Sequence, residues 1–91
     1  MIRVSVVVPV LDDADHLRRC LAALAVQTRP ADEVVVVDNG SRDDGAEVAR
    51  AAGAVVVDEP VRGIARASAR GYDRATGDVV VRLDAVWAAG A

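Results

Sequence analysis

The sequence contains no lysine and no phenylalanine, and it has a single cysteine, one tryptophan and one tyrosine. A Walker-type phosphate loop needs a lysine, so this class of nucleotide site is excluded. One cysteine can form neither an internal disulfide nor a cysteine-built zinc site. The shortage of aromatic side chains argues against a stacking platform for nucleic acid. The net charge of -3 also argues against a binder of nucleic acid or anionic membranes.

Long apolar runs are missing as well. No stretch approaches the roughly 18 apolar residues of a membrane span, and the amino terminus lacks the basic and apolar regions of a secretory leader. We therefore expect a cytoplasmic protein with no membrane segment. With 91 residues, 53% of them hydrophobic and 27% charged, the chain is expected to form one small globular domain or part of a larger one.

Valine (19 residues) and alanine (18 residues) dominate the apolar set. Four valine-rich runs are continuously apolar at their centres, which is typical of strands buried on both faces of a parallel sheet. They are Val4–Val10, Glu33–Val37, Ala54–Val57 and Asp78–Leu83. Between them lie three segments with helical patterns, about 14–28, 43–52 and 63–75. The alternation predicts an α/β fold with right-handed crossovers.

Several residues are expected to begin or end these helices. Asp12 or Asp13 is a candidate cap for the first helix and Ser41 or Asp43 for the second. Gly53 is a helix stop, and Pro30 lies beyond the end of the first helix. Cys20 falls at a core position of the first helical pattern, which favours burial over a nucleophilic role.

Acidic residues follow every predicted strand. They are Asp12 and Asp13 after the first, Asp38 after the second, Asp58 and Glu59 after the third, and Asp84 after the fourth. Ligands of open α/β sheets bind outside the carboxyl ends of the strands, although acids at such positions also serve as caps. A dinucleotide site is excluded because residues 9–14 contain no glycine. A phosphoacceptor receiver domain is excluded because it needs a lysine and a fifth strand.

Taken in order, six segments resemble the amino-terminal part of a family 2 glycosyltransferase. The most specific is Glu33–Asp43, which is similar to that family's second strand and Asp-x-Gly-Ser-x-Asp turn. The others are Val4–Val10, Cys20–Leu24 followed by Gln27–Pro30, Arg62–Ala67, Ala75–Asp78 and Leu83–Ala85. The resemblance runs from about Val4 to Ala85 and covers the first half or less of a typical catalytic domain of this family.

The resemblance implies a fold and a domain boundary. The expected fold is Rossmann-like, with a parallel four-stranded sheet in the order 3-2-1-4 and three crossover helices, as a truncated glycosyltransferase A-type fold. Residues 1–85 would form the nucleotide-sugar-binding half and residues 86–91 a tail that does not match.

The resemblance also implies roles for individual residues. Asp38 would accept a hydrogen bond from the base, usually uracil, and a phosphate would lie at the start of the third helix, where helix N-termini and arginine both favour anions. The expected nucleotide-binding residues are Pro9, Val10, Asp12, Asp38, Gly63 and Arg66. Asp84 matches the first acid of a metal motif for Mn²⁺ or Mg²⁺, but Val86 stands where the second acid is expected.

The function implied is binding of a nucleoside-diphosphate sugar, expected to be UDP-linked, for transfer to an acceptor hydroxyl. The half that supplies the general base in this family is absent, so the 91-residue chain alone is not expected to catalyse transfer. Two alternatives remain open. The chain is a catalytically inactive remnant, or it is an interaction module that forms a homodimer through the edge strand Asp78–Leu83.

Overall fold

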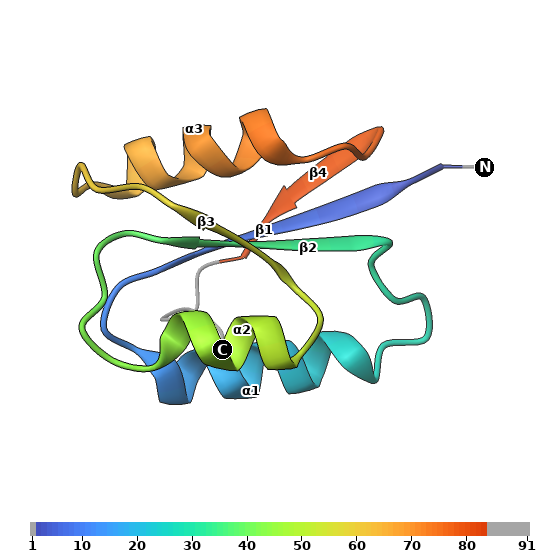
Figure 1. The fold of residues 1–91 in the computed structure, drawn as a ribbon. Coiled ribbons are helices and arrows are strands. Elements are labelled where there is room, and N and C mark those ends of the chain that lie inside the picture. Colours follow the sequence, from blue (N-terminus) through green and yellow to red (C-terminus); the bar gives the residue numbers. More distant parts are fainter. Residues whose placement is uncertain (1, 84–91) are drawn as a thin grey trace.

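The computed structural model describes residues 2–83, which form a three-layer α/β arrangement (Figure 1). Strands and helices alternate along the chain, as the sequence predicts. Their bounds are β1 Val4–Val10, α1 Ala14–Ala25, β2 Glu33–Asp38, α2 Gly45–Ala51, β3 Val55–Asp58, α3 Ile64–Arg74 and β4 Val79–Arg82. Among these residues no helix is long and apolar enough to cross a membrane.

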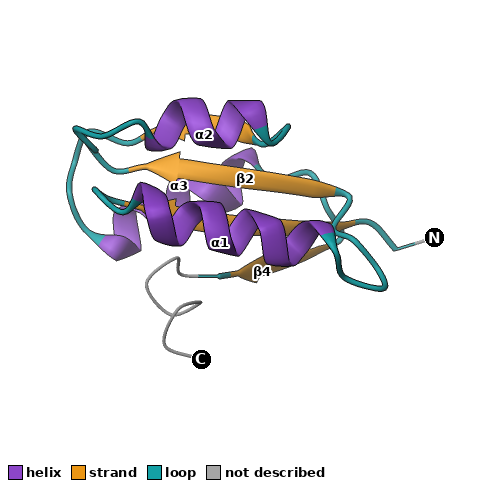
Figure 2. Ribbon diagram, turned by 90° about the horizontal axis from the view of Figure 1, so that it is seen from below, coloured by secondary structure: helices purple, strands orange, loops and turns teal. Residues whose placement is uncertain are grey.

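The four strands form one parallel sheet in the order β3-β2-β1-β4. The helices α1 and α2 cover one face of this sheet and α3 covers the other (Figures 1 and 2). The predicted strand order and number of helices are thus confirmed. Because every strand runs in the same direction, Val10, Asp38 and Asp58 end side by side in register at one edge.

The alternation of side chains along β1 and β2 divides the core between the two faces. On the α1 and α2 face, valines of the strands pack against Leu17, Cys20, Leu21 and Leu24 of α1 and Ala49 of α2. Leu17 is fully buried, and burial raises the pKa of the Cys20 thiol. Cys20 is therefore a core residue, as its position in the helical pattern indicates.

The α3 face has a thinner core, formed by Val7, Val35, Val37 and Ala67. At Gly71 the helix backbone lies directly on the sheet, since an added Cβ would collide with Val7 Cγ1 and would lie 3.0 Å from Val37 Cγ2. Only glycine permits this close approach. It brings α3, and with it the loop before α3, close to the sheet.

The first helix is shorter than the sequence predicts. It ends at Ala25, with Val26 as C-cap, and does not reach Thr28. Its last buried residue is Leu24, and residues 25–30 are exposed. No side chain from residue 25 to residue 30 is buried, so the helical spacing of Thr28 does not place it in the core.

Burial on both faces holds for β1 and the centre of β2 but not for the outer strands. All four residues of β4 are exposed, and Val79, Val80 and Val81 are 45%, 38% and 47% exposed. The strand β3 is half-buried apart from the exposed Asp58. Valine content therefore predicts these strands correctly but overestimates their burial, because each has only one neighbour in the described sheet.

A polar junction joins β1, β2 and the turn before β4 at the amino-terminal end of the sheet. Glu33 Oε1 accepts hydrogen bonds from Ser5 Oγ at 2.8 Å and from the Thr76 N–H at 2.9 Å. Ser5 Oγ in turn accepts the Gly77 N–H at 2.8 Å. The buried Ser5 hydroxyl and the Glu33 carboxylate thus fix the turn that leads into β4.

Candidate functional site

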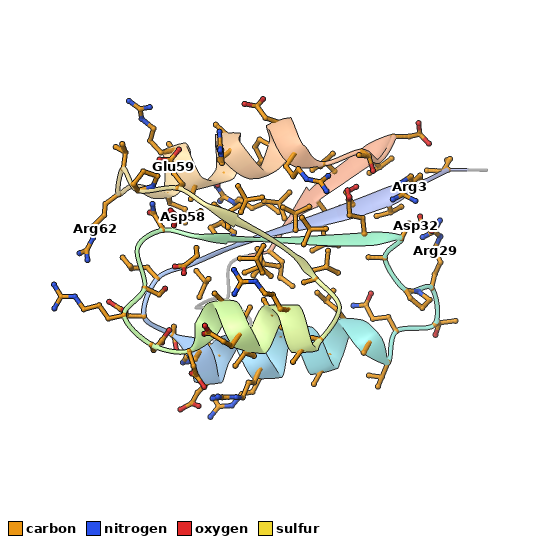
Figure 3. All side chains as sticks on the ribbon, in the orientation of Figure 1. Arg3, Arg29, Asp32, Asp58, Glu59 and Arg62 are labelled. Carbon is orange, nitrogen blue, oxygen red and sulfur yellow. The ribbon has the colours of Figure 1, made fainter. Side chains whose placement is uncertain are left out.

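The carboxyl ends of the strands gather the loops that the sequence marks as functional. Asp58, Glu59 and Arg62 lie at this end of the molecule, whereas Arg3, Arg29 and Asp32 lie at the opposite end (Figure 3). Asp38 and Asp58 are paired neighbours in the register of β2 and β3. The edge therefore carries acidic groups close to one another, which favours cations or hydrogen-bond donors beside it.

Ser41 links the two acids that the sequence assigns to the nucleotide. Its N–H donates to Asp38 Oδ1 at 2.8 Å, and its Oγ accepts the Asp12 N–H at 2.9 Å. Asp12 Oδ1 then accepts the Arg42 N–H at 2.6 Å. Asp12 has a positive φ of 50°, which these contacts hold in place. In the described part of the chain Asp38 Oδ2 has no hydrogen-bond partner.

Asp43 ties the starts of two helices together. Its Oδ2 accepts the Ala14 N–H at the start of α1, and its Oδ1 accepts the Gly45 N–H at the start of α2, both at 3.0 Å. Asp13 and Asp44 occupy the N-cap positions, but neither side chain makes a cap bond. The predicted capping of α1 by its own flanking acids is therefore wrong, because Asp43 provides the acceptor from a distant part of the sequence.

The side chain of Asn39 holds the loop between β3 and α3. Its Nδ2 donates to Glu59 O at 2.8 Å and to Val61 O at 2.9 Å, and its Oδ1 accepts the Gly63 N–H at 2.9 Å. Its own N–H donates to Val10 O at the end of β1. Asn39 therefore connects three of the segments that meet at this edge.

The start of α3 has positive charge and unsatisfied donors. Gly63, with φ of 136°, is the N-cap and provides no side-chain acceptor, and the first turn contains no acid. The first amide N–H groups of α3 are therefore available to an anion. Arg62 and Arg66 are exposed, and within residues 2–83 neither guanidinium forms a hydrogen bond or ion pair.

The predicted site residues fall into three groups. Asp12, Asp38 and Gly63 are brought together through Ser41 and Asn39, and Arg66 lies in the first turn of α3. Pro9 and Val10 are buried. The Val10 side chain packs in the core of the α1 and α2 face, so it can contribute to a nucleoside pocket only through its backbone and its support of the loop. Asp84 lies outside the described residues.

No cluster of three or more histidine, cysteine, aspartate or glutamate side chains suited to a metal ion occurs among residues 2–83. Asp38 and Asp58 alone do not provide such a set. In the sequence, Val86 has no oxygen ligand in its side chain. Residues 2–83 therefore do not form a complete cation site by themselves.

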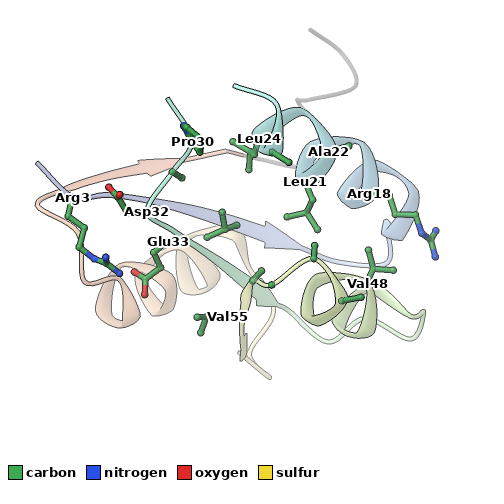
Figure 4. Close-up of a pocket in the computed structure, with 17 residues that line it drawn as sticks. Arg3, Arg18, Leu21, Ala22, Leu24, Pro30, Asp32, Glu33, Val48 and Val55 are labelled. Carbon is green, nitrogen blue, oxygen red and sulfur yellow. The ribbon is translucent and has the colours of Figure 1, made fainter. Parts of the chain in front are cut away.

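A groove of about 870 Å³ lies away from this edge, between α1, α2 and the amino-terminal part of β2 (Figure 4). Its floor is apolar and includes Leu21, Leu24, Val34 and Val48. None of the predicted nucleotide-binding residues lines it. The candidate site is thus an open edge of the sheet, distinct from this groove.

Three residues important at the edge are not among the predicted contacts. Asn39, Ser41 and Asp43 belong to the turn segment that the sequence singles out, and their spacing indicates a tight polar turn. Which backbone groups they bind depends on loops 20 to 30 residues away, so their individual roles follow only from the structure.

Comparison with known proteins decides the family. The model of the family described as "Glycosyl transferase family 2" matches residues 5–85, which is nearly the whole chain. The chain belongs to glycosyl transferase family 2. This family membership and the fold agree with the resemblance drawn from the sequence motifs.

Curated relatives in glycosyl transferase family 2 are longer than this chain. Glycosyltransferase AglE of Haloferax volcanii is 34% identical over 89 residues, which cover 89% of this chain and 29% of AglE. The undecaprenyl-phosphate 4-deoxy-4-formamido-L-arabinose transferase of Pseudomonas fluorescens is 38% identical over 93 residues, covering 90% of this chain and 27% of that protein. The chain thus spans under a third of the length of these relatives.

Solved structures of the same fold include glucosyl-3-phosphoglycerate synthase of Mycobacterium tuberculosis. Its complex with Mn²⁺, UDP and glucosyl-3-phosphoglycerate superposes with a TM-score of 0.79 at 32% identity, over 92% of this chain and 33% of the synthase. Other structures of that synthase contain Mg²⁺ with UDP, or Mn²⁺ with UDP-glucose and phosphoglyceric acid. This family fold therefore accommodates a nucleotide sugar and a divalent cation in that protein.

Proposed function

We propose that residues 1–85 form the nucleotide-sugar-binding half of a family 2 glycosyltransferase and bind a UDP-linked sugar at the carboxyl edge of the sheet. The observation that carries this proposal is the Ser41-bridged pair Asp12 and Asp38, with Asp38 Oδ2 unpartnered, beside the uncapped start of α3. The structures of glucosyl-3-phosphoglycerate synthase with UDP support it through shared fold and sequence.

Asp38 is proposed to read the base. The Ser41 N–H occupies Oδ1 and leaves Oδ2 as an acceptor. The imide N3–H of uracil is a donor and satisfies that oxygen, whereas the N3 of cytosine is an acceptor and would face it without a proton. A site that pairs with a donor rejects a ligand without one because its own polar group is left unpaired.

The diphosphate is proposed to lie toward the start of α3. The free amides of that helix and the guanidinium of Arg66 are complementary to phosphate oxygens. Mn²⁺ or Mg²⁺, when bound, would neutralise charge on the diphosphate, and Asp84 is the proposed ligand from this chain. The transfer to an acceptor hydroxyl needs a base from a segment that these residues do not include.

Binding of uridine and cytidine nucleotides tests this proposal. We expect the chain to bind UDP about tenfold or more tightly than CDP, since the lost hydrogen bond and the unpaired carboxylate together disfavour cytosine. Isothermal titration of both nucleotides, with Mg²⁺ present and absent, measures the difference. Equal affinities for UDP and CDP would contradict the role of Asp38, and no binding of either would contradict the site.

Self-association is a second candidate function, and the exposed edge strand favours it. The three valines of β4 are each more than a third exposed, and the outer edge of β4 pairs with no strand in the described sheet. If two copies paired β4 to β4, the unpaired backbone N–H and C=O groups along the outer side of each β4 would be hydrogen-bonded. Sedimentation of the chain would then show a dimer that Val80→Lys disrupts, with Ala69→Lys on exposed α3 surface as control. A monomer at high concentration contradicts this candidate.

A further inference from the structure

The buried side chain of Asn39 makes three hydrogen bonds that all reach the loop between β3 and α3. The residue is 5% exposed. Its partners are the carbonyl oxygens of Glu59 and Val61 and the amide of Gly63, 20 to 24 residues along the chain. The orientation of the amide follows from these partners, since the opposite orientation would place Oδ1 against two carbonyl oxygens.

Asn39 also lies between the two groups assigned to the nucleotide. It directly follows Asp38, whose carbonyl accepts the Glu59 N–H at 2.9 Å, and it bonds to Gly63, the N-cap of α3. Asn39 is therefore the side chain that links the segment carrying the Asp38 carboxylate to the start of α3. No other side chain among residues 2–83 donates to the carbonyls of this loop.

We propose that Asn39 is a positioning residue that sets the spacing between the base contact at Asp38 and the phosphate contact at the start of α3. This inference rests on the proposed function of the edge. Without the two bonds from Nδ2, the carbonyls of Glu59 and Val61 lose their side-chain donor, and the loop is joined to β2 only by the Glu59 N–H at the Asp38 carbonyl and by the Gly63 N–H at residue 39. Gly63 and Arg66 are then held less firmly where the diphosphate of a bound uridine nucleotide would reach them.

The substitution Asn39→Asp separates positioning from simple support of the fold. Aspartate keeps an oxygen for the Gly63 N–H but, when ionised, turns its second oxygen toward the carbonyls of Glu59 and Val61. When protonated, it can donate to one of them. Burial and the nearby acids Asp38, Asp58 and Glu59 all favour the protonated form, whereas the exposed Arg62 opposes it weakly.

The experiment measures UDP affinity between pH 8 and pH 5.5 for wild type, Asn39→Asp, Asn39→Ala and Gln27→Glu. The last variant makes the same amide-to-acid change on an exposed residue at the other end of the molecule. Affinities are expressed relative to wild type at each pH, which cancels the titration of the UDP terminal phosphate. Amide spectra at each pH give the folded fraction, so each affinity refers to folded protein.

We expect Asn39→Asp to bind UDP about tenfold or more weakly than wild type at pH 8 and to regain affinity as the pH falls. Asn39→Ala should be weakened about equally at every pH, and Gln27→Glu should match wild type. If Asn39→Asp is unfolded at pH 8, refolding at lower pH with UDP binding regained supports the inference, and refolding without binding contradicts it.

The experiment distinguishes a failure of the positioning role of Asn39 from a failure of the proposed UDP binding. The positioning role alone is overturned if the wild-type chain binds UDP but the affinity of Asn39→Asp relative to wild type does not change with pH. It is also overturned if that relative affinity equals one at every pH. Absence of UDP binding by the wild-type chain overturns the proposed function and this inference with it.

Discussion

The variant Asp38→Asn is expected to remove the preference of the chain for UDP over CDP. It should bind UDP about tenfold to a hundredfold more weakly than wild type, and the preference for UDP over CDP should be lost or inverted. The reason lies in the fixed role of Oδ1. Because the Ser41 N–H needs an acceptor, the asparagine must keep its oxygen there and turn Nδ2 toward the base. The new donor faces the N3–H of uracil but pairs with the N3 of cytosine.

Titration of wild type and Asp38→Asn with UDP and CDP measures this change. The matched control is Asp58→Asn, the same substitution on the neighbouring strand, which should retain the wild-type preference. If Asp38→Asn and Asp58→Asn alter UDP affinity equally, the effect is one of general charge at the edge, and specific reading of the base by Asp38 is refuted.

The second large effect concerns stability at the opposite end of the sheet. Glu33→Ala is expected to lower the free energy of unfolding by about 2–3 kcal/mol, because it leaves the Ser5 hydroxyl and the Thr76 N–H without their acceptor. The Glu33 side chain is only 8% exposed and Ser5 is fully buried, so water replaces the bond to the Ser5 hydroxyl poorly. Urea unfolding measures the loss. Glu47→Ala on the exposed surface of α2 serves as control and should change stability by less than about 0.5 kcal/mol.

The same carboxylate makes stability depend on pH. Hydrogen bonding from the Thr76 N–H, with smaller contributions from Ser5 and Arg74, lowers the pKa of Glu33 below its usual value of 4.5. The stability it contributes is therefore present in full above that usual pKa and is lost as the pH falls through the lower pKa of the folded state. Glu33→Gln, which keeps a neutral acceptor, should show a shallower loss of stability below about pH 4.5 than wild type. An equal slope would contradict this account.

Asp32 also makes the free energy of unfolding depend on pH. The Val4 N–H, with help from Arg29, lowers the pKa of Asp32 in the same direction. Some acid sensitivity should therefore remain in Glu33→Gln. Both groups lie at the amino-terminal end of the sheet, so acid should weaken the attachment of β1 to the Asp32 segment and of the turn before β4 to β2.

Much of the fold could be predicted from the sequence because local patterns and tertiary packing agree. Valine runs and amphipathic spacing place the elements, and the resemblance to family 2 glycosyltransferases implies the strand order 3-2-1-4 that the sheet adopts. The errors arise where one residue's environment is set by distant ones. The first helix stops at Ala25, one residue after its last buried side chain, and the valines of β4 are exposed because β4 has only one neighbouring strand in the described sheet.

The candidate site could be predicted only in part, for a related reason. Acids at strand ends are visible in the sequence, and Asp12, Asp38 and Gly63 do come together. The groups that bring them together, the hydroxyl of Ser41 and the amide of Asn39, act across 20 to 30 residues. A turn sequence alone cannot tell whether its polar side chains cap their own turn or hold another loop. Conversely, the sequence predicts that Val10 binds the nucleotide, but its side chain packs in the core.

We propose that this chain, a member of glycosyl transferase family 2, binds uridine diphosphate at the carboxyl edge of its sheet. The most direct measurement is an amide NMR titration of the 91-residue chain with UDP, first without and then with Mg²⁺. The account predicts a dispersed free spectrum and shifts centred on Asp38, Ser41, Gly63 and Arg66. A dispersed spectrum that UDP leaves unchanged, or shifts confined to the groove around Leu24 and Val48, would contradict it.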